Sequence, residues 1–379
     1  MKNVSKIFSI LVVVMMLVAI MASVVAAEPT DFDDFVHPRV LSDGKLKVGF
    51  IHDKPEFESV QRVVQQAKIE AAHRGWELID LVYDNDQDLR DNILNLINQD
   101  VDALIMFSLP SMESKEDLVA MAREKGIGVY NLDNQMVSGI IMNSTMPNAV
   151  AAAELMYRIG EDHLWNDSMA IITKRPIQVH VERTDVMKAL CGVYPSMNIL
   201  TEEDISTAQI DELQAANEDT KTWMTKYGDE LTGILTSTDY FGVPVAEAVA
   251  QYGDPTGEKV WVAGIDGGAQ AWAYIRNKTP FQYSYAQPFE LYAHNVFEVV
   301  DELQVQGLNP GDAGCKLTKS GETIYATGMV VTRSNVPAVG QSIHAAFNYY
   351  GMDPNDANAW YNWTDAGGAY QITDYKESK

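Results

Sequence analysis

A regular alternation of short apolar segments and amphipathic segments, beginning at Lys45, limits the possible folds of this chain more than any other feature. Apolar runs of four to eight residues bounded by Gly or Pro are typical of buried strands, and the segments between them keep helical spacing. This strand–helix rhythm predicts parallel sheets covered by helices on both faces. It restarts at the helix expected over residues 147–160, which favours an α/β chain with two doubly wound parallel-sheet lobes facing each other across a cleft.

In the first block, strands are expected over 45–52, 76–84, 103–109, 127–133 and 139–144, with helices over 56–74, 86–98 and 113–125. In the second, strands are expected over 168–174, 197–205, 233–239 and 259–266, with helices over 147–160, 181–191, 210–227, 245–252 and 269–277. A strand over 281–288, a helix over 289–306 and a strand over 323–332 follow.

The N-terminus has the layout of a secretory signal peptide over residues 1–27. Lys2 and Lys6 precede an apolar run over 7–25, and Ala26 and Ala27 are the small residues that a signal peptidase requires. The alternative is an uncleaved membrane anchor, because the run is nearly long enough to span a bilayer. Either way we expect export, to a periplasm or to the cell surface.

The charge of the chain argues against nucleic-acid partners. It has 28 Lys and Arg against 53 Asp and Glu, a formal net charge of -25, and such a field repels phosphate backbones. The seven His residues show no HxH or HExxH grouping, so no catalytic metal is expected. Cys191 and Cys315 could pair in an exported protein, or could both remain thiols.

Nucleotide-dependent and hydrolase chemistry lack their sequence motifs. The first strand is followed by neither GxGxxG nor GxxxxGK[ST], and the glycines of GIDGGA have the wrong spacing. No GxSxG elbow is present. We therefore expect no enzyme and no cofactor, although paired carboxylates across a cleft leave a carbohydrate-active enzyme as an alternative.

Three acidic residues lie at the carboxyl ends of expected strands: Asp133 in IGVYNLDNQ, Asp239 in GILTSTDYFG and Asp266 in KVWVAGIDGG. In open α/β sheets this is the end where ligands bind. Carboxylates accept paired hydrogen bonds from vicinal hydroxyl groups. The sequence therefore predicts one polar cleft for a small hydroxylated ligand such as a sugar.

The lobe pattern, together with VERTDVM, LTSTDYFG, VAGIDGG and the strand-end Gln287–Pro288, resembles the periplasmic sugar-binding proteins of the ribose/galactose type. That family also supplies the effector domain of LacI-type repressors. The resemblance covers residues 45–339. It implies a type I periplasmic binding protein-like fold, with three hinge crossovers near Asn143, Gln287 and Leu317.

These crossovers give an N-terminal lobe of 45–143 plus 288–317, a C-terminal lobe of 144–287 plus 318–339, and a C-terminal extension of 340–379. The resemblance also implies a non-enzymatic receptor whose lobes close on a monosaccharide. Its partner would be the permease of an ABC-type transporter or a membrane sensor, and we expect a monomer.

The ligand-binding residues that this resemblance and the strand-end pattern nominate are Phe57, Ser108, Asp133, Asn134, Arg183, Thr238, Asp239, Asp266 and Gln287. Phe57 would cover one sugar face, where the family has a further aromatic residue. Asn134 replaces the family's arginine, and Thr238 replaces its ligand asparagine. Asp239 suits helix capping or support of a ligand residue better than direct contact. These departures keep sugar-site chemistry but put ribose itself in doubt, and a nucleoside or a quorum signal is an alternative ligand.

Overall fold

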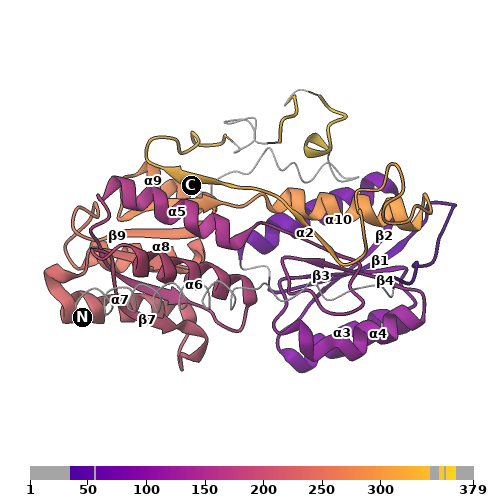
Figure 1. Ribbon diagram of the computed structural model, residues 1–379, viewed down its shortest axis with the longest axis horizontal. Coiled ribbons are helices and arrows are strands. Elements are labelled where there is room, and N and C mark those ends of the chain that lie inside the picture. The colour runs from indigo at the N-terminus through magenta and orange to yellow at the C-terminus, as the bar shows by residue number, and fades with distance from the viewer. Residues whose placement is uncertain (1–34, 55–56, 342–349, 354–355, 364–379) are drawn as a thin grey trace, which may run out of the picture. The chain divides into compact units, whose positions relative to one another are not determined.

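The computed structural model describes residues 35–54, 57–341, 350–353 and 356–363 (Figure 1). The expected signal peptide, residues 1–27, lies outside the described residues, as does part of the expected C-terminal extension. None of the helices in the described ranges combines the length and the apolar character needed to cross a membrane.

The first sheet contains six parallel strands in the order β11-β5-β4-β3-β1-β2. Its strands are β1 (Lys47–His52), β2 (Glu77–Val82), β3 (Ala103–Phe107), β4 (Gly128–Leu132), β5 (Met142–Thr145) and β11 (Glu322–Tyr325). The helices that pack on it are α2 (Glu58–Arg74), α3 (Asp86–Asn98), α4 (Glu116–Glu124) and α10 (Phe289–Gln304). Helices α2 and α10 cover one face, and α3 and α4 cover the other (Figure 1). We call this unit the first lobe.

The second sheet has the order β12-β10-β9-β8-β6-β7 and is parallel except for its edge strand β12. Its strands are β6 (Ser168–Thr173), β7 (Asn198–Asp204), β8 (Gly233–Thr236), β9 (Trp261–Asp266), β10 (Phe281–Ala286) and β12 (Met329–Thr332). The helices of this second lobe are α5 (Asn148–Asp162), α6 (Gln178–Val193), α7 (Glu212–Tyr227), α8 (Asp239–Gln251) and α9 (Ala269–Arg276). Short 3₁₀ helices lie at Met112–Lys115, Ile205–Thr207, Gly228–Glu230 and Trp360–Asn362. The expected α/β class with two doubly wound lobes is confirmed.

The chain passes between the two sheets three times. It crosses from β5 to α5, from β10 to α10, and from β11 to β12. The third crossing lies after Tyr325, so the expectation that it lies near Leu317 is wrong, and residues 318–325 do not belong with the second lobe. The expected single strand over 323–332 is two strands, because β11 pairs with β5 while β12 pairs with β10.

Gly328 lies between β11 and β12, where the crossing chain runs close to β10. A Cβ atom there would lie 2.1 Å from the carbonyl oxygen of Ala286 and 2.3 Å from the ring of Tyr285. Only a residue without a side chain can approach β10 so closely, so the third crossing requires glycine at position 328.

Helix α8 begins at Asp239, six residues before the start expected from the sequence. Thr238 is its N-cap, and its hydroxyl oxygen accepts a hydrogen bond from the backbone N–H of Tyr240 at 3.3 Å. Pro244 lies inside the helix. The earlier start matters for the site because it fixes Asp239 in the first turn of α8.

The described part of the C-terminal extension packs on α2 and α10. The indole of Trp363 stacks on His73 with ring centroids 3.6 Å apart, and Trp360 stacks on His294 at 4.3 Å. The hydroxyl of Tyr350 donates a hydrogen bond to the carboxylate of Glu290 at 3.0 Å. The two cysteines do not pair, since Cys191 and Cys315 are both free.

Candidate ligand-binding site

The loops that follow three strands hold non-glycine residues with positive φ: Ser108 after β3 (φ 50°), Asp133 after β4 (φ 51°) and Asp266 at the end of β9 (φ 149°). Such conformations cost about 1–3 kcal/mol each and persist only where the surroundings enforce them. All three lie at the carboxyl ends of parallel strands, where an open α/β sheet binds its ligand.

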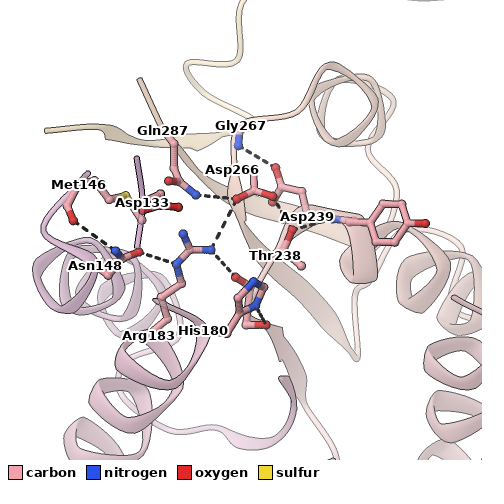
Figure 2. Close-up of polar contacts among 12 residues, drawn as sticks. Asp133, Met146, Asn148, His180, Arg183, Thr238, Asp239, Asp266, Gly267 and Gln287 are labelled. Carbon is pink, nitrogen blue, oxygen red and sulfur yellow. Dashed lines mark hydrogen bonds and ion pairs between the residues drawn. The ribbon is translucent and has the colours of Figure 1, made fainter. Parts of the chain in front are cut away.

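Arg183 is the centre of the polar cluster in Figure 2. It comes from α6 and is only 2 % exposed. Its Nε donates to Asn148 Oδ1 at 2.7 Å, and its Nη1 donates to the carbonyl oxygen of Ser237 at 2.8 Å. Nη1 also lies 3.6 Å from Asp266 Oδ1. Its Nη2 has no hydrogen-bond partner among the residues that the structure describes.

The carboxylate of Asp266 accepts hydrogen bonds from the residues that follow β10 and β8, the strands next to β9 in the sheet. Gln287 Nε2 donates to Oδ1 at 2.6 Å, and the hydroxyl of Thr238 donates to Oδ2. Burial raises the pKa of the Asp266 carboxyl, and the guanidinium of Arg183 opposes that rise. Thr238, Asp266 and Gln287, three of the nominated residues, are therefore in one hydrogen-bonded group beside Arg183 (Figure 2).

Asp133 brings a carboxylate from the first lobe toward the same guanidinium. It is buried at the end of β4, and the hydroxyl of Thr145 donates to its Oδ1. Burial raises the pKa of Asp133, and the charge of Arg183 lowers it. The close-up shows Asp133 on one side of Arg183 and Asp266 on the other (Figure 2). One cation thus serves two buried acids, one from each lobe.

Asp239 holds the backbone turn that follows Asp266. Its Oδ2 accepts hydrogen bonds from the backbone N–H groups of Gly267 and Gly268, at 2.9 and 3.0 Å, and from the hydroxyl of Ser284 at 2.7 Å. Burial raises the pKa of Asp239, and the nearby charge of Asp266 raises it further. Its contacts therefore fix the turn that carries Asp266.

Asn134 and Ser108 differ in what their side chains offer. The amide of Asn134 accepts from the N–H of Leu109 at 2.5 Å and donates to the carbonyl oxygen of Met106 at 2.8 Å, so it joins the ends of β3 and β4. Ser108 is partly buried, and its backbone N–H donates a hydrogen bond to the carbonyl oxygen of Leu132 at 3.0 Å. Its hydroxyl has no hydrogen bond within the described residues and is the freer group of the two.

Phe57 lies at the N-cap position of α2 and contacts the second lobe. Its ring centroid is 4.4 Å from that of Tyr240, and the amino group of Lys174 lies 5.9 Å from the ring. Tyr240 was not singled out from the sequence. Its position in the sequence directly after Thr238 and Asp239 could have indicated that it lies near the site.

Other residues that the sequence did not reveal hold the site together. Asn148 orients Arg183, as described above, and His180 Nδ1 lies 2.7 Å from the hydroxyl of Ser237. Burial and the charge of Arg183 hold the pKa of His180 well below its ordinary value. Glu58, in the first turn of α2, accepts from the N–H of Ala269 at 2.9 Å with both carboxylate oxygens. No local pattern marks these residues, because each acts on a partner far away in the sequence.

Comparisons with known proteins show the family and the fold of the chain. A family model described as the periplasmic binding protein domain matches residues 55–306. A xylitol-binding protein from Mycolicibacterium smegmatis is 25 % identical over 179 residues, which are 47 % of this chain and 50 % of that protein. The chain therefore matches about half the length of this curated relative.

Among solved structures, an ABC transporter solute-binding protein from Burkholderia graminis in complex with D-arabinose is similar with a TM-score of 0.68 and 21 % identity. The match covers 79 % of this chain and 99 % of that one. An ABC transporter solute-binding protein from Agrobacterium vitis with bound allitol gives a TM-score of 0.66 and 17 % identity, over 77 % of this chain and 97 % of that one. At these identities the likeness shows the shared fold.

Proposed function

The chain belongs to the periplasmic binding protein family, and on that premise we propose that it is an exported receptor for a monosaccharide or a polyol. The ligand binds between the two lobes, and the loaded protein delivers it to the permease of an ABC-type transporter. In this proposal the protein binds its ligand without turning it over, and it requires no cofactor.

The observation that carries the proposal is the shared position of Arg183 between Asp133 of the first lobe and Asp266 of the second. Carboxylates accept from ligand hydroxyl groups, and the open Nη2 of Arg183 donates to a hydroxyl or ring oxygen. Hydrogen bonds to charged groups contribute about 1.5–3 kcal/mol each. Three such groups around one small ligand therefore supply both affinity and orientation.

Because these groups come from both lobes, ligand binding should favour the state in which the lobes are closed. A ligand held by Asp133 and by Asp266 contacts both lobes only when the lobes are together. It therefore binds the closed state more tightly and shifts the population toward that state. A transporter that recognises the closed state would thereby distinguish loaded from empty receptor.

The named relatives support a polyhydroxylated ligand. Xylitol, D-arabinose and allitol, which appear in the descriptions of the similar proteins, are all small molecules with vicinal hydroxyl groups. Their hydroxyl patterns differ. The carboxylates of Asp133 and Asp266 and the guanidinium of Arg183 can form hydrogen bonds with such hydroxyl groups.

A thermal-shift screen of the purified protein over pentoses, hexoses, polyols and nucleosides tests the proposal. A ligand at about 100 times its dissociation constant adds about 2.7 kcal/mol to the free energy of unfolding. Calorimetric titration then compares the wild type with Asp133→Asn, Asp266→Asn and Arg183→Lys, which keep nearly the same side-chain volume. The control is Arg90→Lys, at an exposed ion pair with Asp117.

We expect a sugar or polyol hit that each of the three site variants weakens at least about tenfold and that the control leaves unchanged. A hit that survives all three variants would place the binding site elsewhere. Hydrolysis of glycosides that Asp266→Asn abolishes would instead make the protein a carbohydrate-active enzyme.

A further inference from the structure

A cavity of about 510 Å³ adjoins the Arg183 cluster. Its walls come from the starts of α2 and α10 in the first lobe and from α7, α8 and α9 in the second. Asp266 lines this cavity and also lies beside Arg183, so the cavity and the Arg183 cluster share one carboxylate. Arg183, Asp133 and Gln287 are not part of its lining, which distinguishes the cavity from the cluster.

The walls of the cavity combine rings with hydrogen-bonding groups. Phe57, Tyr240 and Phe289 provide aromatic surface, whereas α7 provides the polar side chains of Asn217 and Lys221. Small-molecule sites in proteins are concave, mostly apolar, and contain a few polar groups that fix orientation. A sugar ring fits such a lining, because its C–H face packs on aromatic rings while its hydroxyl groups form hydrogen bonds.

Two of the polar side chains are not engaged by the protein. The ammonium group of Lys221 and the amide of Gln270 form no hydrogen bond or ion pair with another residue in the ranges that the structure describes, and both line the cavity. Asn217, in contrast, donates to the carbonyl oxygen of Pro244 at 3.0 Å. Lys221 and Gln270 are therefore the donors that a bound molecule would use.

We propose that this cavity is a second sugar subsite and that the preferred ligand is a disaccharide, with one ring at Arg183 and the other between Tyr240 and Lys221. This proposal rests on the proposed function, since it assigns the first ring to the cluster around Arg183. Asp266 accepts hydroxyl hydrogen bonds at the junction of the two rings. Because α2 completes the cavity wall from the first lobe, the second ring also contacts both lobes and adds to the preference for the closed state.

The test compares each monosaccharide with the disaccharide that contains it, by calorimetric titration of the full chain. The probe pairs are D-xylose and xylobiose, D-glucose and cellobiose, and D-galactose and melibiose. Two variants probe the cavity: Lys221→Ala removes a donor, and Gln270→Trp fills the space from an exposed position on α9. The matched control is Lys226→Ala, an exposed lysine on the same helix whose amino group contacts Tyr227 instead of the cavity.

For at least one pair we expect the disaccharide to bind at least about tenfold more tightly than its monosaccharide, as one additional charge-assisted hydrogen bond provides. Lys221→Ala and Gln270→Trp should remove that advantage and leave the monosaccharide affinity and the control unchanged. Binding of monosaccharides without any gain from a second ring would overturn this inference and leave the proposed function intact. A disaccharide advantage that persists in both cavity variants would also overturn the subsite alone. Failure of every sugar and every polyol to bind would overturn both proposals.

Discussion

Arg62 and Glu290 form a buried two-point ion pair that joins α2 to α10 at the second crossing. Nε of Arg62 donates to Oε1 of Glu290 at 2.6 Å, and Nη2 donates to Oε2 at 2.8 Å. Nη2 also donates to the carbonyl oxygen of Gln287 at 3.1 Å, and Nη1 donates to that of Asp266 at 3.4 Å. The pair therefore connects a first-lobe helix to the backbone of two site residues.

Glu290→Gln should strongly destabilise the protein. The variant removes the charge that pairs directly with the buried guanidinium of Arg62, and breaking a buried pair in this way costs about 3–5 kcal/mol. Urea unfolding at neutral pH measures the loss. The double variant Arg62→Met/Glu290→Leu should recover much of the stability, because it removes both charges. A double variant no more stable than the single one would show that the pair is not the cause.

The buried carboxyl of Asp239 should make stability depend on pH. Its pKa in the folded protein is raised above the ordinary value of 3.8, so the folded state holds more protons than the unfolded state between the two pKa values. This contribution is therefore most favourable at acidic pH and is lost as pH rises through the folded pKa. The difference in unfolding free energy between the wild type and Asp239→Asn, measured from pH 4 upward, should shift steadily in favour of the variant. A flat difference for Asp239→Asn across this pH range would contradict the prediction.

Glu58→Gln should weaken ligand binding without unfolding the protein. Glu58 accepts from Ala269 N–H across the lobes, and the neutral amide replaces a charge-assisted hydrogen bond at the start of α9 with a weaker one. A loss of about 1 kcal/mol from the closed state would reduce affinity about fivefold. Calorimetry measures this change, with Glu116→Gln in the first turn of α4 as the control. Equal affinities for both variants would mean that Glu58 does not help to close the lobes.

Gly328→Ala should destabilise the third crossing. The added methyl group would overlap the Ala286 carbonyl group and the Tyr285 ring, and such overpacking costs about 1–3 kcal/mol. Gly192→Ala, near the end of α6, meets no atom within 4 Å and should be neutral or slightly stabilising. Thermal unfolding of both variants measures the contrast, and similar melting temperatures would argue against a steric role for Gly328.

The pattern of apolar segments was sufficient to predict most elements, because burial and helical spacing leave a local signature. Examples of correctly predicted elements are the strand directly before Asp133, the strand that ends at Asp266 and the helix that carries Arg183. The strand over 323–332 was misread because one apolar run serves two sheets, and nothing in its composition records which neighbour each half pairs with. The start of α8 was misplaced because the expected strand was carried through Asp239, whereas Thr238 caps the helix at that point.

For the site residues too, the sequence indicated which residues take part but not all of their contacts. Strand-end position and family likeness nominated Arg183, Asp266, Thr238 and Gln287. The fold joins the last three by hydrogen bonds and brings Arg183 within ion-pair distance of Asp266. The same reasoning could not reveal that the Asn134 amide is occupied by backbone groups. Nor could it reveal that Asn148 orients Arg183.

The sequence by itself determined the class of fold and the acidic, strand-end character of the site, since hydrophobic periodicity and the strand–loop boundary are properties of adjacent residues. Only the tertiary structure decided that one guanidinium lies between an acid from each lobe, that Glu58 reaches α9, and that a cavity continues beyond Asp266. Those relationships join residues far apart in the chain, and their energies depend on distances and burial that exist only once the two sheets have formed.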